Sequence, residues 1–467
     1  KYGSNLAVNN LTVSLPKGKI IGLLGPNGSG KTTFIKLLCR LYDPTEGEIL
    51  LNGVDIRKYD YAEYQALFSV VFQDFRLFDN RTAYENIAFA LRVTGESKKL
   101  IEKRVPYFLN VVGLRSKADS YPTELSGGEK QKIAFSSVYA SAPDVLVFDE
   151  PSSNLDMKAI GELADLIQRA KISGKTILIA EHRIWYLMDI VDRVVYMQDG
   201  RIASDMEAAA FKALPEADIR RMGLRVRDLS VSESGGAKTI AADGLLSAQK
   251  ISVRLGGRNV LNNLSFQASR GEIIAIAGVN GAGKSTLAKM LCGLQKNSSG
   301  TVLWAGKPMS RRLRRKKAYM VMQDVGHQLF TDSVAAECAL GIKTPNKDKI
   351  DCALEKVELL AYKERHPLSL SGGQMQRLAV VVSDICGKEL LVFDEPTSGL
   401  DLKSMEEVGI LTRSLATQGK VLLIITHDIE FMMRICTRIL FIRDGEIVED
   451  LSGGQKEKIV RLLRGEE

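Results

Sequence analysis

The sequence lacks several features that would set it apart from ordinary globular proteins. No run of about 18 or more apolar residues occurs, so we expect no membrane-spanning helix. No signal-peptide pattern is present. The six cysteines include no C-x-x-C pair and no metal-ligand spacing, which argues against a zinc site or a disulfide scaffold. These absences fit a protein of a reducing cytosol.

Length and charge set wider bounds. A chain of 467 residues allows two or three domains, each large enough to bury its own core. The net charge of +8 and the pI near 9.0 are compatible with nucleic acid or with an anionic membrane surface, and do not choose between them. The densest basic run is RRLRRKK, residues 311–317, which is either a solvated face or a surface for a phosphate-rich partner.

An internal repeat determines the predicted architecture. The segments GPNGSGKT, Gly25–Thr32, and GVNGAGKS, Gly278–Ser285, both match G-x-x-x-x-G-K-[ST]. Each follows a short apolar run, IIGLL or IIAIA, that is typical of a buried strand. Each precedes a helical pattern, TFIKLLCRL or TLAKMLCGL. Strand, glycine loop and helix form the context that a phosphate-binding loop requires.

The residue types in these loops suit nucleotide binding. Glycines let backbone N–H groups close around phosphate oxygens, and the helix N-terminus adds its positive dipole end. We expect the lysines to reach the β- and γ-phosphates and the following hydroxyls to bind Mg²⁺. The candidate nucleotide-binding residues are Gly25, Asn27, Gly28, Gly30, Lys31, Thr32 and Thr33 in the first copy, and Gly278, Asn280, Gly281, Gly283, Lys284, Ser285 and Thr286 in the second.

Two acidic strand ends also repeat. VLVFDEP and LLVFDEP each combine four apolar residues, a pattern typical of a buried parallel strand, with a following acidic pair. Asp149 and Asp394 at the strand ends suit a Mg²⁺ contact. Glu150 and Glu395 come next, where a carboxylate could polarise water against the γ-phosphate.

Three further features recur in the same order and at similar spacing. Gln73 ends VVFQ and Gln323 ends MVMQ. His182 ends LIAEH and His427 ends IITH, so two of only four histidines occupy equivalent places. LSGGE and LSGGQ precede the two acidic strands by about 20 residues. The halves are therefore predicted to be homologous modules.

This ordered set of motifs resembles the ABC ATPases, over nearly the whole chain and twice. The resemblance implies an α/β fold in which each module has a P-loop core, a β-subdomain and a helical subdomain that carries LSGG. We expect modules at residues 1–205 and 246–450, a linker at 206–245 and a tail at 451–467.

The resemblance also implies an ATPase that binds ATP and Mg²⁺ at two sites, each shared between one module's phosphate loop and the other module's signature. Gln73 and Gln323 would be catalytic and would contact the metal, and the two histidines would be catalytic. Neither half lacks its glutamate or histidine, so both sites are expected to hydrolyse ATP. The signature residues that would close the sites are Ser371, Gly372 and Gly373 for the first, and Ser126, Gly127 and Gly128 for the second.

Two asymmetries are visible near the starts of the halves. Aligning the glycine loops places Tyr2 against Leu255, and in this family an aromatic residue there stacks on adenine. The second half also has a strand-like stretch, LLSAQKISVR, without a counterpart in the first. The chain begins with Lys1 rather than Met, so we expect a trimmed N-terminus.

A third LSGGQ begins at Leu451. No acidic strand or histidine follows it, only KEKIVRLLRGEE. We therefore interpret it as a tail element without a nucleotide role, which leaves two modules.

The resemblance favours the energy subunit of a transporter, docked at the cytoplasmic face of the membrane on separate membrane-spanning subunits, with a possible substrate-binding membrane subunit. HQLFTDSV, EHR and the two-module chain resemble energy-coupling-factor importers of vitamins or metal ions. The first half is a mosaic: LYDPTEGEILLNGVDI resembles exporters, and FQDFRLF resembles the cell-division ATPase.

A soluble tandem ATPase acting on ribosomes or RNA is the alternative, and cell-envelope remodelling is a third. The short linker argues against the translation factors, so no nucleic-acid partner is expected. Solute and direction are not predicted, because specificity in this family lies in subunits that this chain does not carry.

Overall fold

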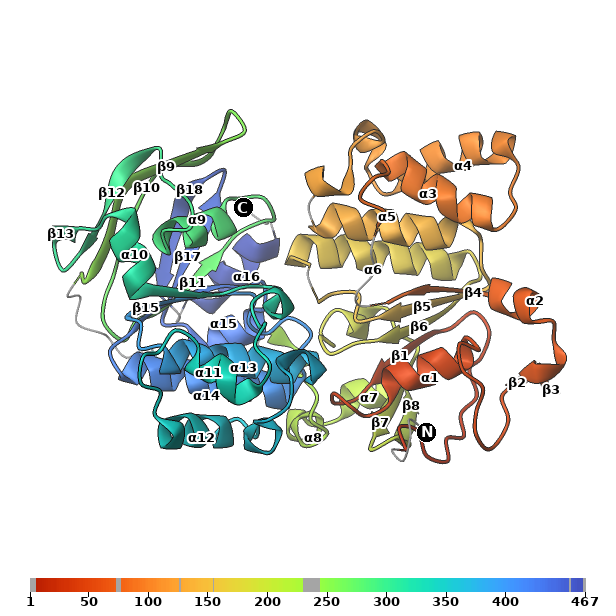
Figure 1. Cartoon of the computed structure of the whole chain (residues 1–467). Coiled ribbons are helices and arrows are strands. Elements are labelled where there is room, and N and C mark those ends of the chain that lie inside the picture. The colour runs from red at the N-terminus through yellow and green to blue at the C-terminus, as the bar shows by residue number, and fades with distance from the viewer. Residues whose placement is uncertain are drawn as a thin grey trace. The chain divides into compact units, whose positions relative to one another are not determined.

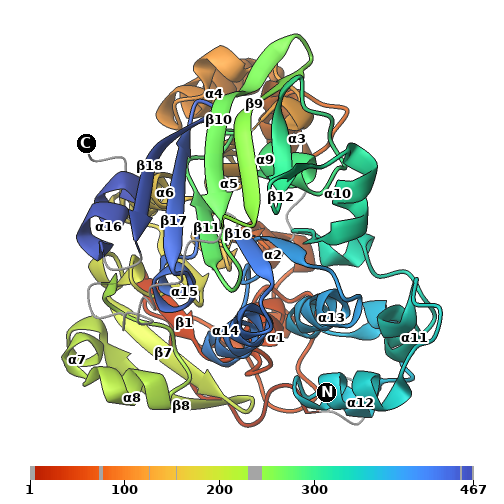
Figure 2. The ribbon, with the colours of Figure 1, turned by 90° about the vertical axis from the view of Figure 1, so that its left-hand side faces the viewer.

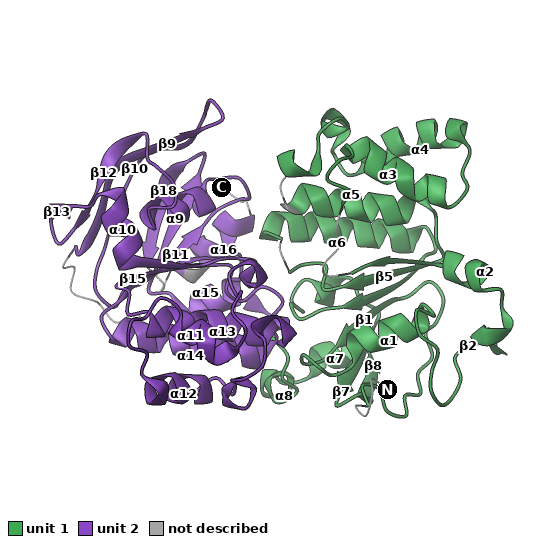
Figure 3. Cartoon of the chain, in the orientation of Figure 1, with its two compact units in different colours: residues 1–227 green, residues 228–467 purple. Residues whose placement is uncertain are grey.

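A computed structural model describes residues 6–72, 77–125, 127–153, 155–229, 244–452 and 455–464 of the chain. The chain divides into two compact units, Lys1–Arg227 and Asp228–Glu467, which are described separately (Figure 3). Among the described residues, no helix has both the length and the apolar character that crossing a bilayer requires.

The first unit is built on a six-stranded sheet of order β4-β5-β6-β1-β7-β8 (Figure 1). The first five strands of that order run parallel, and β8 pairs antiparallel with β7. The parallel strands β1, β5 and β6 are fully or almost fully buried, which is the pattern expected when both faces of a sheet are covered. The strands are β1 (Ile20–Leu24), β4 (Phe68–Val71), β5 (Val145–Asp149), β6 (Thr176–Ala180), β7 (Arg193–Gln198) and β8 (Arg201–Glu207).

The second unit repeats this sheet strand for strand. Its order is β14-β15-β16-β11-β17-β18, again with only the last strand antiparallel. The predicted repeat of two α/β modules with a parallel core is therefore confirmed. The strands are β11 (Ile273–Ala277), β14 (Ala318–Val321), β15 (Leu390–Asp394), β16 (Val421–Ile425), β17 (Arg438–Arg443) and β18 (Glu446–Ser452).

A smaller antiparallel sheet distinguishes the units. In the second unit β9 (Leu246–Leu255), β10 (Arg258–Ala268), β12 (Ser299–Trp304) and β13 (Lys307–Pro308) form a four-stranded sheet of order β10-β9-β12-β13 (Figure 2). Among the described residues of the first unit, this sheet is represented by the two-stranded ribbon of β2 (Leu50–Leu51) and β3 (Val54–Asp55). LLSAQKISVR, predicted to be a strand, lies in β9.

Helices flank the sheets at corresponding places in the two units. In the first unit α3 packs on α4 and α5, and in the second α11 packs on α12 and α13, so each unit has a helical subdomain. The helices of the first unit are α1 (Lys31–Leu38), α2 (Tyr61–Ala66), α3 (Ala83–Val93), α4 (Lys98–Val111), α5 (Gly127–Ala140), α6 (Met157–Ile172), α7 (Ala208–Ala213) and α8 (Glu216–Arg221). Those of the second are α9 (Lys284–Leu291), α10 (Arg311–Lys317), α11 (Val334–Ala339), α12 (Lys347–Glu355), α13 (Gly372–Ile385), α14 (Leu402–Thr417), α15 (Ile429–Ile435) and α16 (Lys456–Arg464).

The expected linker and tail both begin with folded structure. The stretch at 206–245 starts with the end of β8 and with α7 and α8, and Phe211 and Ile219 are fully buried in the core of the first unit. Residues 230–243 lie outside the described part of the chain. The expected tail starts inside β18, and Ile459 of α16 is also buried. Apolar residues at helical spacing explain the difference, because they give these segments a face to bury.

The cysteines after the phosphate-loop lysines behave as predicted. Cys39 and Cys292 are buried core side chains, and all six cysteines are free thiols. Burial raises the pKa of both Cys39 and Cys292 to about 12, so neither is a reactive thiolate.

Candidate functional site

The first residue of each loop must be glycine because the backbone of a neighbouring strand lies very close to it. Gly25 and Gly278 have φ values of 153° and 143°. A Cβ at Gly25 would lie 2.3 Å from the carbonyl oxygen of Met197, and one at Gly278 would lie 2.2 Å from that of Ile442. No side chain fits at these distances, so each loop passes directly over the strand beside it.

The last glycine of each loop starts the following helix. Gly30 and Gly283 are left-handed, with φ of 101° and 102°, and the helices α1 and α9 begin at the next residue. The middle glycines, Gly28 and Gly281, also have positive φ. Consecutive N–H groups at such a turn and helix start can all face one anion. The geometry is that of a phosphate-binding loop.

Each loop lysine lies folded over its own loop. Nζ of Lys31 donates to the carbonyl oxygens of Gly25 at 2.7 Å and Pro26 at 3.0 Å. Lys284 makes the same pair of contacts, with Gly278 at 2.7 Å and Val279 at 2.9 Å. Both ammonium groups are therefore held at the mouth of the loop, where phosphate oxygens would bind. Asn27, Thr33, Asn280 and Thr286 lie on the same loops and helix starts, and all are at least partly accessible.

Two of the three predicted metal ligands, a hydroxyl and an aspartate, are brought together in each unit. Oγ1 of Thr32 donates to Oδ2 of Asp149 at 2.9 Å, although 117 residues separate them. Ser285 donates to Asp394 in the same way. The other carboxylate oxygen of Asp149, Oδ1, is buried without a hydrogen-bond partner in the described part of the chain. A hydroxyl and a carboxylate with a spare buried oxygen are the kind of ligands that Mg²⁺ takes, so the residues fit this ion.

Burial changes the acidity of these carboxyls. It raises the pKa of Asp149 to about 6, and the hydrogen bond from Thr32 only partly opposes the effect. Burial also raises the pKa of Asp394, again against the hydrogen bond from Ser285. A carboxylate that is poorly solvated in this way is one that a divalent cation would stabilise.

The two glutamates after these strands share an unusual backbone conformation. Glu150 and Glu395 both have φ of 51°, which lies in the left-handed backbone region that residues other than glycine rarely adopt. Each is held there by its N–H, which donates to the end of the neighbouring strand, at Ala180 or Ile425. Strained residues of this kind concentrate at functional sites.

The histidines reach the glutamates. Nε2 of His182 lies 3.1 Å from Oε1 of Glu150 and 2.9 Å from Oδ1 of Asn27. Nε2 of His427 lies 3.6 Å from Oε1 of Glu395. In each unit the structure thus unites the phosphate loop, the acidic strand end and the histidine, three motifs far apart in the sequence.

The signature segments open helices. Ser371 caps α13 and forms a capping box with Gln374, and Gly372 and Gly373 are the first helical residues. Gly127 and Gly128 begin α5 in the first unit. A Cβ at Gly128 would lie 3.1 Å from Cβ of Ala159, and one at Gly373 would lie 3.3 Å from Leu400, which explains why glycine is used there.

Some predicted residues are exposed, and others cannot be placed. Gln323 is exposed, two residues after β14. Tyr2, Gln73 and Ser126 lie outside the described residues. Leu255, the residue aligned with Tyr2, ends β9. In the third LSGGQ copy, Leu451 and Ser452 end strand β18 instead of opening a helix, a context unlike that of the other two.

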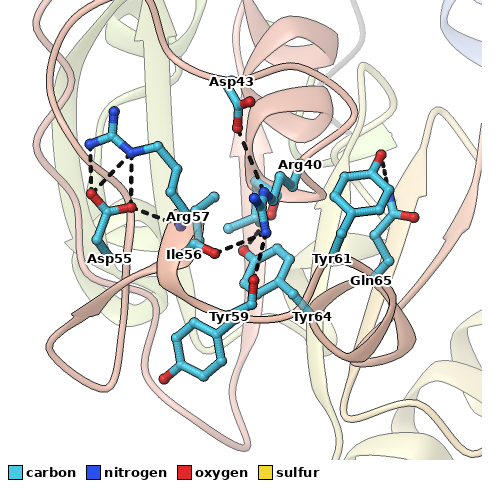
Figure 4. A network of polar contacts seen from close by, with 10 residues as sticks. Arg40, Asp43, Asp55, Ile56, Arg57, Tyr59, Tyr61, Tyr64 and Gln65 are labelled. Atoms are coloured by element: carbon cyan, nitrogen blue, oxygen red, sulfur yellow. Dashed lines mark hydrogen bonds and ion pairs between the residues drawn. The ribbon is translucent and has the colours of Figure 1, made fainter.

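A polar network fixes the far end of the phosphate-loop helix in the first unit (Figure 4). Nη1 of Arg40 donates to the carbonyl oxygens of Ile56 at 3.0 Å and Tyr59 at 3.2 Å, and its guanidinium lies 5.2 Å from the ring centroid of Tyr61. The hydroxyl of Tyr64 donates to Leu38 at the end of α1. Sequence reasoning missed this anchoring, which depends on contacts across about 26 residues.

The basic run has a corresponding structural role in the second unit. Arg311 donates to the carbonyl oxygen of Gly293 at 2.8 Å, and Arg314 donates to that of Met290 at 2.8 Å, so both satisfy the end of α9. Lys317 pairs with Glu389. Three cations of the run are therefore used within the fold, although Arg311 is exposed, as are Arg312, Arg315 and Lys316.

The sequence matches a known protein family and individual relatives. A family model described as ABC transporter matches residues 8–153 and 261–398. A Treponema denticola protein named as an ABC transporter ATP-binding protein is 48% identical, over 97% of this chain and 95% of its own length. A Methanosarcina acetivorans protein with the same name is 30% identical over 96% of this chain and 83% of its own length.

Solved structures show a similar fold. An RNase-L inhibitor superimposes with a TM-score of 0.70 at 21% identity, covering 99% of this chain and 92% of that one. An archaeal ribosome recycling factor, solved with a ribosomal stalk protein, gives a TM-score of 0.66 at 22% identity, covering 98% and 90%. At these identities the likeness concerns the fold alone.

Proposed function

Because the chain belongs to the ABC transporter family of ATP-binding proteins, we propose that it is the energy subunit of a transporter, which drives a solute through separate membrane-spanning subunits. The chain is a tandem ABC ATPase and binds ATP. The observation that carries the site assignment is the meeting of Lys31, Thr32, Asp149, Glu150 and His182 in one unit, with the same set in the other.

The chemistry at each site follows from these positions. The loop N–H groups and Lys31 or Lys284 hold the β- and γ-phosphates. Glu150 or Glu395 orients and polarises the attacking water, and the neighbouring histidine contacts the γ-phosphate. Bound Mg²⁺, held by the Thr32–Asp149 or Ser285–Asp394 pair together with Gln73 or Gln323, would neutralise charge on the phosphates. Tyr2 would stack on adenine in the first site.

Family membership supports two ATP sites shared between the modules. In this arrangement Ser371, Gly372 and Gly373 close the site of the first loop, and Ser126, Gly127 and Gly128 close that of the second. ATP binding then favours a closed pair of modules and hydrolysis reopens it, which is how the chain would move its membrane partners. We extend the domain proposal accordingly, with modules at about 1–227 and 244–464 and the linker between them.

The transporter role is supported by the names of the relatives that match over nearly the whole chain. Within it we propose uptake of the energy-coupling-factor type, at the cytoplasmic face of the membrane. The support is the sequence of two segments, EHR at residues 181–183, which contains His182, and HQLFTDSV at 327–334, which runs from the 3-10 turn ending at His327 to the start of α11. A soluble tandem ATPase acting on ribosomes is the second candidate, favoured by the ribosome-associated proteins among the similar folds.

The experiment that separates these roles is purification of the tagged chain from its own cells in mild detergent. Polytopic membrane proteins at near one-to-one ratio would support the transporter role and identify the solute class. Co-sedimentation with ribosomal subunits in a sucrose gradient, in the presence of a non-hydrolysable ATP analogue, would support the alternative. A matched sample that carries Lys31→Ala and Lys284→Ala would show which association depends on bound nucleotide.

A further inference from the structure

Each of the two histidines has an acidic neighbour in the sequence, which precedes His182 in the first unit and follows His427 in the second. In the first unit the sequence is Glu-His-Arg, residues 181–183, and in the second it is Thr-His-Asp, residues 426–428. All six residues of the two segments are buried. Burying a carboxylate is unfavourable unless its oxygens accept hydrogen bonds, so the partners of Glu181 and Asp428 reveal what each one does.

Glu181 accepts four hydrogen bonds, two at each oxygen. Oε1 accepts from the backbone N–H of His182 at 2.7 Å and of Arg183 at 3.1 Å. Oε2 accepts from the N–H of Ser152 at 3.2 Å and from the hydroxyl of Tyr186 at 2.8 Å. Burial and the nearby Glu181 carboxylate raise the pKa of Tyr186 well above its usual value, so this hydroxyl keeps its proton and remains a donor. Only a carboxylate offers two such acceptor oxygens.

Arg183 adds a second link between the same two segments. Its Nη1 donates to the carbonyl oxygens of Ser152 at 3.1 Å and Leu155 at 3.4 Å. Ser152 follows Glu150 by two residues, so the loop after the glutamate is attached to the histidine segment through both Glu181 and Arg183. Among the described residues, Oε2 of Glu150 is buried without a hydrogen-bond partner, and its Oε1 faces the ring of His182.

The second unit holds its histidine segment through a different set of hydrogen bonds. Oδ2 of Asp428 accepts from Oγ1 of Thr397 at 2.9 Å, which links the histidine segment to the loop after Glu395. The hydroxyl of Thr426 and the N–H of His427 both donate to Oε2 of Glu395, each at 3.3 Å. Here the glutamate beside the reaction site also holds the histidine segment.

We propose that Glu181 and Arg183 are positioning residues of the first ATP site, which hold His182 and the loop after Glu150 so that Glu150 is engaged by the histidine ring instead of by the backbone. In the second unit Thr426 performs the equivalent task through Glu395, and Asp428 performs it through Thr397. The two pairs are therefore alternative solutions, and each should work in the other unit only when both of its members are exchanged together. This inference rests on the proposed role of His182 at the γ-phosphate.

The test measures phosphate release by the full chain with Glu395→Gln as the common background, so that turnover comes from the first site, and gives kcat and KM for ATP and the melting temperature of each variant. The variants are His182→Ala, Glu181→Gln, Glu181→Thr, Arg183→Asp and the exchange variant with Glu181→Thr and Arg183→Asp. The exchange variant also carries Tyr186→Phe, because the Tyr186 hydroxyl would lose its acceptor and the second half has Phe431 at the equivalent position. Asp192→Asn is the matched control, because Asp192 in the same unit also accepts a backbone hydrogen bond, from Ile20, but lies outside the site.

On a logarithmic scale, we expect Glu181→Gln to lose at least half as much kcat as His182→Ala loses. The KM for ATP should stay within about twofold of that of the parent chain, because the phosphate loop is unchanged. Glu181→Thr and Arg183→Asp should each lose as much kcat as Glu181→Gln does. The exchange variant should have a kcat within about twofold of that of the parent chain. Asp192→Asn should lower the melting temperature and leave kcat unchanged.

Two results would overturn the proposal. One is a full kcat in Glu181→Gln while His182→Ala is impaired, and the other is an exchange variant no better than the worse of its single variants. If Glu181→Gln does not fold, the exchange variant decides alone. A full kcat in His182→Ala would instead contradict the proposed role of His182, and so distinguishes failure of the site assignment from failure of this inference.

Discussion

Oε1 of Glu150 lies 3.1 Å from Nε2 of His182, although the two residues follow different strands and are 32 positions apart. The contact exists because β5 and β6 are parallel neighbours, so their carboxyl ends meet at one edge of the sheet. The equivalent residues of the second unit, Glu395 and His427, lie 3.6 Å apart for the same reason. An identical strand order thus places the same reacting groups together twice.

Glycine at the start of each loop should be required for folding. Gly25→Ala would place a Cβ 2.3 Å from the backbone oxygen of Met197, and we expect it to lower the free energy of unfolding by about 4 kcal/mol or more. Gly18→Ala is the control, since Gly18 also has a positive φ, 72°, but open space around it. It should cost about 1 kcal/mol. Urea unfolding monitored by circular dichroism measures both, and equal losses would contradict the explanation.

Each loop lysine should hold one ATP. Because Lys31 and Lys284 lie at the mouths of separate loops, Lys31→Ala or Lys284→Ala should each reduce the number of ATP molecules bound per chain from about two to about one. Calorimetric titration with Mg²⁺ and ATP gives this number. Lys98→Ala, which removes a fully solvated lysine on α4, serves as the control and should bind like the unmodified chain. A single-lysine variant that still binds two would refute the assignment.

Asp149 should make the free chain less stable as the pH rises. Its folded pKa of about 6 exceeds the ordinary value of 3.8, so between these pH values the folded state holds a proton that the unfolded state has released. Stability from this group is therefore present below about pH 4 and is lost as the pH rises through about 6.

Asp149→Asn removes this pH dependence while keeping an acceptor for Thr32. Without Mg²⁺ or nucleotide, the variant should be more stable than the unmodified chain by about 1–3 kcal/mol at pH 7.5, and the difference should shrink towards pH 4. Unfolding curves at the two pH values test this. Asp144→Asn, at the exposed start of the same strand region, is the matched control. A difference that grows towards low pH would show that the sign is wrong.

The three LSGG copies should not be equivalent. Ser371→Asp keeps the helix cap, because aspartate caps as well as serine, but places a negative charge where a γ-phosphate would approach. Measured in a chain whose second site is silenced by Glu395→Gln, kcat for ATP should fall by about tenfold or more. Ser452→Asp makes the same change in the third copy, at the end of β18, and should leave the rate unchanged. Loss of activity in Ser452→Asp would show that the third copy has a nucleotide role.

The phosphate loops and acidic strand ends could be predicted because they are local patterns. In each, glycine spacing, apolar runs and acidic pairs are contiguous in the chain, and the geometry they specify is set within about ten residues. Thr32 and Asp149 were each predicted to contact Mg²⁺, and the structure joins them by a hydrogen bond.

Other features depend on contacts between distant segments. The linker was predicted too long: the apolar positions of α7 and α8 are visible in the sequence, but the core in which Phe211 and Ile219 are buried is built from distant segments of the first unit. Arg311 and Arg314 looked like a solvated basic surface, but their guanidinium groups satisfy carbonyl groups at the end of α9. The role of Glu181 was missed, although the difference between EHR and THD was visible, because its donors come from two separate loops.

The central claim is that Glu150 and Glu395 serve two ATP sites, one for each phosphate loop. The most direct measurement is phosphate release by Glu150→Gln, Glu395→Gln and the variant with both changes, with ATP binding measured alongside. The account predicts that each single variant releases phosphate more slowly, that the double variant falls by about 10²-fold or more, and that all three still bind ATP. A double variant that keeps more than about a tenth of the unmodified rate would contradict it.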